Sequence, residues 1–172
     1  MTHENMSRSV AALLVASALL LGVLVPGGPI ETRSFAHIAP LVLGSFNTFL
    51  TTLGIGSFAF AYFVLKHRHW AFMASAVCGI LYFLVYALDL GKIFPVSPDE
   101  MPTALFAIEA TGTLVSFPLT YLSLKLAHMR IRSDGDRERV AVMKKEHILL
   151  LGIMVLAGIG IITFATLSAM GR

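Results

Sequence analysis

The stretch WAFMASAVCGILYFLVYALDLGKIF, residues 70–94, decides the fold class of this chain. It contains no charged residue before Asp89. A helix rises about 1.5 Å per residue, so about 20 mainly apolar residues are needed to cross the hydrocarbon core of a bilayer. The stretch meets that length, and it therefore predicts a transmembrane α-helix.

Four other apolar segments flank this stretch, and turn-forming residues separate them. The five expected spans cover residues 10–25, 40–65, 70–94, 103–127 and 148–170. Pro26-Gly27-Gly28-Pro29 follows the first segment, and Pro40 opens the second, where its missing N–H costs least. The expected fold is all-α: a polytopic transmembrane bundle of about five spans that forms a single membrane domain, residues 1–172.

Composition supports this fold class. Hydrophobic residues make up 56% of the chain and charged residues 13%, with a mean hydropathy of +0.80. A soluble domain usually carries about 25% charged residues. The connections between the expected spans are short, so the sequence provides no separate soluble domain for catalysis.

The distribution of Lys and Arg predicts the orientation, because cytoplasmic loops carry an excess of these residues. With the N-terminus in the cytoplasm, ten of the 13 lie on the cytoplasmic side: Arg8, Lys66, Arg68, Lys125, Arg130, Arg132, Arg137, Arg139, Lys144 and Lys145. The other three lie outside: Arg33, Lys92 and Arg172. An odd number of spans then places the C-terminus outside, and a multi-pass protein of the inner (cytoplasmic) membrane is expected.

The polar loop over residues 129–146 holds six of the 13 Lys and Arg residues. Its Arg and Lys residues alternate with acidic residues and have no aromatic residues between them, so nucleic-acid binding is not indicated. Contact with anionic membrane lipids accounts for the charge. Docking of a cytoplasmic partner remains an alternative.

Two carboxylates lie inside the expected spans, and such residues usually face a bundle interior or a watery cavity. Counted at 1.5 Å per residue, Asp89 lies roughly 7–8 Å and Glu109 roughly 9 Å below the outer ends of their helices. Asn47 lies at roughly 10 Å by the same count. The three residues thus occupy one layer, and they predict a polar pocket that opens toward the outside.

Neighbouring residues extend this candidate ligand- or ion-binding site. Lys92 follows Asp89 at i+3, so we expect it to neutralise that carboxylate and to leave Glu109 to bind a proton, a cation or a ligand amine. Tyr86 shares the helical face of Asp89, and Thr51 lies one turn from Asn47. Thr113 begins a stripe of hydroxyl residues that follows Glu109 toward the cytoplasmic side.

The same pattern has a structural interpretation. Ser and Thr hydroxyls bond back to their own helix, and small residues promote close helix packing. Gly44, Thr48, Thr52 and Gly56 repeat every four residues and form a candidate interface for a homo-oligomer. An ion pair between Asp89 and Lys92 at the headgroup level would likewise be structural.

Histidines near the cytoplasmic boundary are weak candidates for a haem or metal site. His67 and His128 are placed to face each other across helices, and His147 lies at the same level. Histidine is also common at helix ends, where its positive form interacts with the helix dipole. No cofactor is therefore predicted.

The favoured interpretation is a small membrane protein that binds a small solute or cation in the outward-facing pocket, with transport or conduction as an extension of binding. No catalytic residues are predicted, because the sequence lacks a nucleophile elbow, a zinc-protease motif and a phosphate-binding loop. Alternatives are a non-catalytic subunit or assembly factor of a larger membrane complex, and an intramembrane lipid-modifying enzyme.

Overall fold

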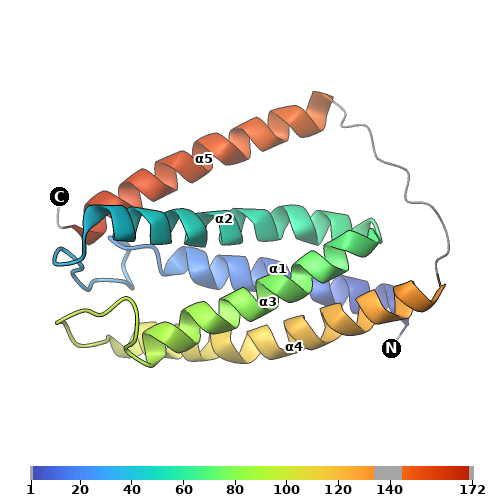
Figure 1. The fold of residues 1–172 in the computed structure, drawn as a ribbon, viewed down its shortest axis with the longest axis horizontal. Helices are drawn as coiled ribbons and strands as arrows, with labels where there is room; N and C mark the ends of the chain where they lie inside the picture. Colours follow the sequence, from blue (N-terminus) through green and yellow to red (C-terminus); the bar gives the residue numbers. More distant parts are fainter. Residues whose placement is uncertain (1, 134–144, 171–172) are drawn as a thin grey trace.

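The chain forms a bundle of long α-helices that run side by side (Figure 1). This computed structural model describes the backbone of residues 2–133 and 145–170, and the side chains of residues 2–129, 156 and 158–170. Within those residues the elements are α1 (His3–Val23), α2 (Pro40–Leu65), α3 (His69–Leu90), α4 (Thr103–Ser133) and α5 (Lys145–Ala169). The expected all-α class is confirmed.

Among the described residues, four helices are long and apolar enough to cross a membrane: α1, α2, α3 and residues 103–129 of α4. The apolar part of α5 with described side chains runs over Gly158–Ala169, so many side chains of the expected span over residues 148–170 lie outside the described residues. α1 starts earlier than the expected residue 10, because the side chain of Thr2 accepts a hydrogen bond from the N–H of Asn5 and caps the helix. At the far end, α4 extends to Ser133, beyond the expected boundary at residue 127.

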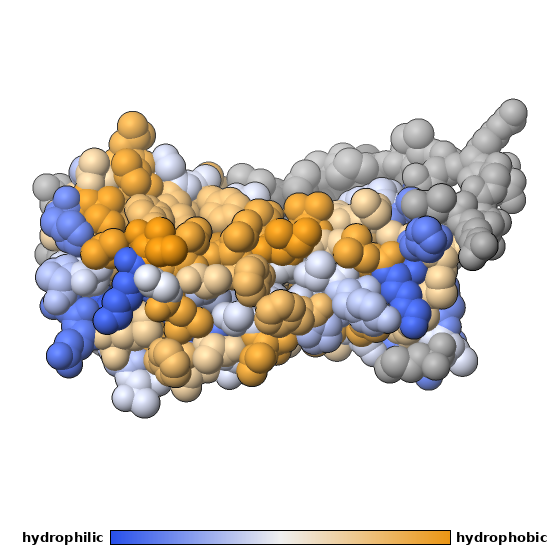
Figure 2. Space-filling view, turned by 60° about the horizontal axis from the view of Figure 1, so that its bottom comes forward, coloured by the Kyte–Doolittle hydropathy of each residue, from blue (hydrophilic) through white to orange (hydrophobic). Residues whose placement is uncertain are grey.

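The surface has the layout of a membrane protein. Figure 2 shows apolar side chains across the middle of one face and hydrophilic residues gathered at both ends of the long axis. Many large apolar side chains of the protein are exposed, among them Phe106, Leu114, Phe117 and Tyr121 on α4. A water-soluble domain rarely exposes a contiguous apolar area of this kind, whereas lipid tails cover it at no cost.

α3 and α4 pack most closely, and small residues allow the approach. A Cβ atom placed on Gly79 of α3 would collide with Thr120, and one placed on Gly112 of α4 would collide with the ring of Tyr86. Tyr82 and Tyr86 are fully buried between the helices, with their rings stacked at a centroid distance of 6.3 Å. The two glycines therefore set the distance at which α3 and α4 meet.

Two connections cover the end of the bundle where α2 and α4 begin: residues 24–39 and residues 91–102. The backbone N–H of Ser34 donates to Asp99 (2.7 Å), and the hydroxyl of Ser97 donates to the carbonyl of Ser34 (3.0 Å). The N–H of Phe35 donates to the carbonyl of Ala169, which attaches the first connection to the end of α5. We call this the looped end of the bundle.

α5 packs against α2 and contacts it through residues near the looped end. Asn47 of α2 donates a hydrogen bond to Thr166 of α5 (3.1 Å). Farther along, α5 diverges from α2, so that the two helices form a V in Figure 1. Leu156, Ile159 and Phe164 of α5 are exposed, as expected for residues that face lipid.

Candidate functional site

A buried ion cluster lies at the looped end, and Arg33 is its centre. The guanidinium binds Asp89 of α3 through two parallel bonds, from Nη1 to Oδ1 (2.9 Å) and from Nη2 to Oδ2 (2.7 Å). It also binds Glu31 through Nε (3.0 Å) and Nη2 (2.6 Å). Bidentate pairs of this kind are the strongest and most directional ion pairs in proteins.

All three members of this cluster are buried, with exposed fractions of 4% for Glu31, 7% for Arg33 and 8% for Asp89. Burial disfavours the charged guanidinium, but the hydrogen bonds that Arg33 donates to Glu31 and Asp89 outweigh it and raise the pKa of Arg33 above its ordinary value. Arg33 is therefore a permanent cation. It fastens the connection between α1 and α2 to the end of α3.

Glu109 of α4 lies beside this cluster and has no cation of its own. Its carboxyl is within hydrogen-bonding reach of Asp89, and its residue is 2% exposed. Among the described residues, neither the buried Oε2 atom of Glu109 nor the buried hydroxyl of Tyr86 on the facing helix has a hydrogen-bond partner. Buried polar atoms without a partner are rare, and each one needs an explanation such as a bound ligand or water.

The formal charges of this cluster and of Glu109 together do not balance. Glu31, Asp89 and Glu109 provide three carboxylates, and Arg33 provides one positive charge. Burying an unpaired carboxylate is costly unless a proton or a cation compensates it. The arrangement is therefore suited to holding one further positive group next to Glu109.

Lys92 does not have the role expected from the sequence. α3 ends at Leu90, so Lys92 lies outside the helix with a φ of 53° and is exposed. The i+3 relation to Asp89 consequently does not place the two side chains on one helical face. Arg33 forms the ion pair with Asp89 in its place.

The expected pocket residues line a small cavity at this end. A cavity of about 50 Å³ is lined by Asn47, Tyr86, Asp89 and Glu109, together with Glu31 and apolar side chains. Asn47 is 3% exposed. Phe35 and Pro95, one from each connection, form part of the wall, so the loops cover the pocket from the end of the bundle.

Thr51 and Thr113 lie apart from this cavity. Thr51 lines a separate apolar cavity between α1, α2 and α5. The hydroxyl of Thr113 donates to the carbonyl of Glu109, and the hydroxyls of Ser116 and Thr120 likewise bond back to α4. These three hydroxyls thus find their hydrogen-bond acceptors within their own helix.

The histidine candidates do not form a metal site in the part of the chain that the structure describes. His67 packs against His3, with ring centroids 5.7 Å apart, and its Nδ1 atom pairs with the hydroxyl of Ser7 (3.4 Å). His128 is exposed, and the side chain of His147 lies outside the described residues. No three His, Cys, Asp or Glu side chains converge as metal ligands among the residues described.

Sequence reasoning missed Glu31 and Arg33. Arg33 was counted only as a topological charge, and Glu31 was not considered. A usable signal was present, because the short connection between the first two spans had to lie at the same end as Asp89 and Glu109. Buried carboxylates need a cation, and Arg33 was one of the few cations at that end.

One comparison with known proteins gives a match. A family model described as "Domain of unknown function (DUF8051)" matches residues 6–147. No curated protein and no solved structure matches the chain. The matched range contains Glu31, Arg33, Asp89 and Glu109, so the whole ion cluster lies within the family region.

Proposed function

We propose that this chain, which belongs to the family described as a domain of unknown function (DUF8051), is a membrane protein that binds a small cation. The ligand lies between Glu109 and Tyr86, next to the pair formed by Arg33 and Asp89. The function is binding rather than catalysis. Transport of the same cation is a further step that the protein performs if the site opens on both sides.

The observation that carries this proposal is the pair of unpartnered buried atoms, Oε2 of Glu109 and the hydroxyl of Tyr86. They come from helices that pack against each other, and both residues line the same cavity. A cation with N–H donors satisfies both oxygens. It also supplies one of the two positive charges that three carboxylates and one guanidinium lack.

Size and ligand type restrict the cation. The cavity of about 50 Å³ exceeds the ~10–15 Å³ needed for a water molecule, so it has room for a small ammonium group. Within the described residues, the carboxylates do not form a set of three metal ligands. Glu31 and Asp89 already accept hydrogen bonds from Arg33. An ammonium group, which needs one carboxylate and one hydroxyl, fits better than a divalent metal.

The proposal includes the orientation and location expected from the sequence. The protein lies in the inner membrane with five spans and a cytoplasmic N-terminus, and the looped end faces outward. One feature supports this orientation: Arg33, one of the three positive residues outside, is buried in the ion cluster. The exposed positive charge at the looped end is therefore even smaller than the residue count indicates.

Thermal unfolding in lipid nanodiscs tests the proposal. Methylammonium chloride is the probe, and choline chloride at equal ionic strength is the salt control, because its quaternary ammonium group has no N–H donor. We expect methylammonium to raise the melting temperature of the wild-type protein by a few degrees at saturation, since a ligand that binds only the folded state stabilises it. Glu109→Gln, which keeps the size of the side chain, should abolish this rise.

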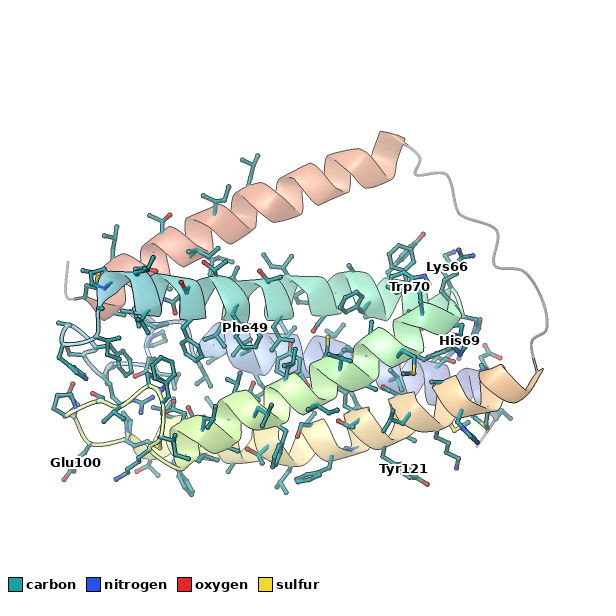
Figure 3. All side chains as sticks on the ribbon, in the orientation of Figure 1. Phe49, Lys66, His69, Trp70, Glu100 and Tyr121 are labelled. Atoms are coloured by element: carbon teal, nitrogen blue, oxygen red, sulfur yellow. The ribbon has the colours of Figure 1, made fainter. Side chains whose placement is uncertain are left out.

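A matched control removes a carboxylate at the same end without touching the cavity. Glu100 is exposed in the connection between α3 and α4, at the looped end (Figure 3). Glu100→Gln should retain the full methylammonium response. A wild-type protein that does not respond, or a Glu109→Gln variant that responds like the wild type, would contradict the proposal.

A further inference from the structure

An apolar cleft lies between α1, α2 and α5, in the half of the bundle toward the looped end. It has a volume of about 130 Å³, and its walls include Ala18 and Gly22 of α1, Gly54 and Phe58 of α2, and Ala165 of α5. Apolar cavities of about this size bind benzene-sized molecules in other proteins. The cleft therefore has room for a short hydrocarbon chain.

The cleft adjoins the carboxylate cavity. Five residues line both spaces: Leu21, Leu24, Pro26, Asn47 and Leu50. These residues form a wall that the hydrocarbon space shares with the cavity lined by Glu109 and Tyr86. Asn47 is the polar member of this shared wall, and its amide is held by Thr166 of α5.

We propose that the cleft and the carboxylate cavity form one site for a primary alkylamine. The ammonium group binds Glu109 and the hydroxyl of Tyr86, and the alkyl chain lies in the cleft between α1, α2 and α5. The proposal rests on the cation-binding function above and adds the class of ligand. It also includes an entry route for the ligand: an amphiphile enters the cleft from the membrane, between the helices.

Charge complementarity selects this occupant over other amphiphiles. A fatty acid would bring a further negative charge to a cluster of carboxylates. A phospholipid headgroup would bring a phosphate, and the guanidinium of Arg33 is already bound by two carboxylates. A quaternary ammonium has no N–H to donate to Glu109. A primary amine meets both requirements, an apolar chain and a donating cation.

The first test compares hexylamine, methylamine and hexanol as probes of the wild-type protein in phosphatidylcholine nanodiscs, with melting temperature as the readout. Each fully buried methylene strengthens binding by about fourfold. We expect hexylamine to bind at least about tenfold more tightly than methylamine. Hexanol should shift the melting temperature of the wild-type protein no more than that of the Glu109→Gln protein. The variant controls for effects of hexanol that arise from its partition into the lipid.

The second test fills the cleft. A Cβ atom on Gly22 meets no atom within 4 Å, so Gly22→Leu places a side chain in the cleft without a backbone clash. We expect it to weaken hexylamine binding at least tenfold and to leave methylamine binding unchanged. Gly160→Leu is the matched control, because Gly160 of α5 is also free of neighbours and does not line the cleft. Ala165→Leu fills the same cleft from α5 if Gly22→Leu does not fold.

The outcomes separate this inference from the proposed function. The inference is overturned if methylamine binds in a Glu109-dependent way but hexylamine binds no more tightly. It is also overturned if the cleft-filling variants do not change hexylamine binding. In both cases the proposed function still stands. If neither amine gives a Glu109-dependent shift, both fail. If phosphatidylethanolamine in the nanodisc competes with hexylamine, the occupant is the lipid headgroup amine and not a free alkylamine.

Discussion

The two ends of the bundle carry similar residues and use them differently. At the looped end, Arg33 is paired with Asp89 inside the protein, with side-chain exposures of 5% and 11%. At the opposite end, Arg8 is paired with Glu4 on the surface, with side-chain exposures of 69% and 63%. Figure 3 places Lys66, His69 and Trp70 at that second end, which we call the open end, and Glu100 at the looped end.

This difference shows that a count of charges does not reveal their role. The ion pair between Arg8 and Glu4 at the open end is hydrated. For such exposed charges the number of positive residues matters more than any single pairing, as expected of a topological signal. The looped end has few charges, and their effect comes from burial, because a low dielectric strengthens each interaction and penalises each unpaired group. Function is therefore expected at the end with fewer charges.

The largest expected effect comes from removing the buried cation. Arg33→Met keeps the apolar bulk but leaves Glu31 and Asp89 without a cation beside Glu109. Breaking a buried pair by removing one partner costs about 3–5 kcal/mol. We expect that loss in the free energy of unfolding, measured by denaturant titration in a mild detergent.

Arg8→Met provides the comparison at the open end. Exposed ion pairs on helices contribute little, so this variant should unfold like the wild type. If the two variants lost the same stability, the burial of Arg33 would not have the energetic role described here. A double variant, Arg33→Met with Asp89→Asn, should recover part of the loss because it removes one of the unpaired charges.

A smaller effect is expected where α3 and α4 meet. Gly112→Ala puts a methyl group into the space of the Tyr86 ring, which is 1% exposed and cannot move outward. Overpacking of this kind typically costs about 1–3 kcal/mol. Because Tyr86 lines the carboxylate cavity, the variant should also weaken methylammonium binding, as measured by the thermal shift.

Gly160→Ala is the control for the change of residue type. It also replaces a helical glycine, but its Cβ meets no atom within 4 Å. Alanine has the higher helix propensity, so this variant should match or slightly exceed the wild type in stability. If Gly112→Ala and Gly160→Ala lost equal stability, the loss in Gly112→Ala would not come from the close contact between Gly112 and Tyr86.

The sequence allowed the helices and their polar layer to be predicted, because helical rise is constant and depth follows from residue number. This count brought Asn47, Asp89 and Glu109 to one level, and all three line the same cavity. It could not identify the partner of Asp89, because that pairing depends on how a connection folds back over the bundle. Nor could it place the end of α3, which decides where Lys92 lies.

The smallest expected effect compares two residues with positive φ, one at each end. Lys92 has a φ of 53° and His67 a φ of 55°, in the region that favours glycine. Lys92 is exposed, and among the described residues its side chain forms no ion pair or hydrogen bond with Asp89, which binds Arg33. Lys92→Gly should therefore leave the free energy of unfolding unchanged or raise it by up to about 1 kcal/mol.

His67→Gly relieves a similar strain but removes the contacts with Ser7 and His3. It should therefore be less stable than Lys92→Gly by about 1 kcal/mol, the typical contribution of one hydrogen bond. Denaturant titration of both variants measures the difference. A substantial loss in Lys92→Gly would mean that Lys92 neutralises a carboxylate of the cluster, as the i+3 spacing indicated, and that the buried charges are balanced differently from the arrangement around Arg33.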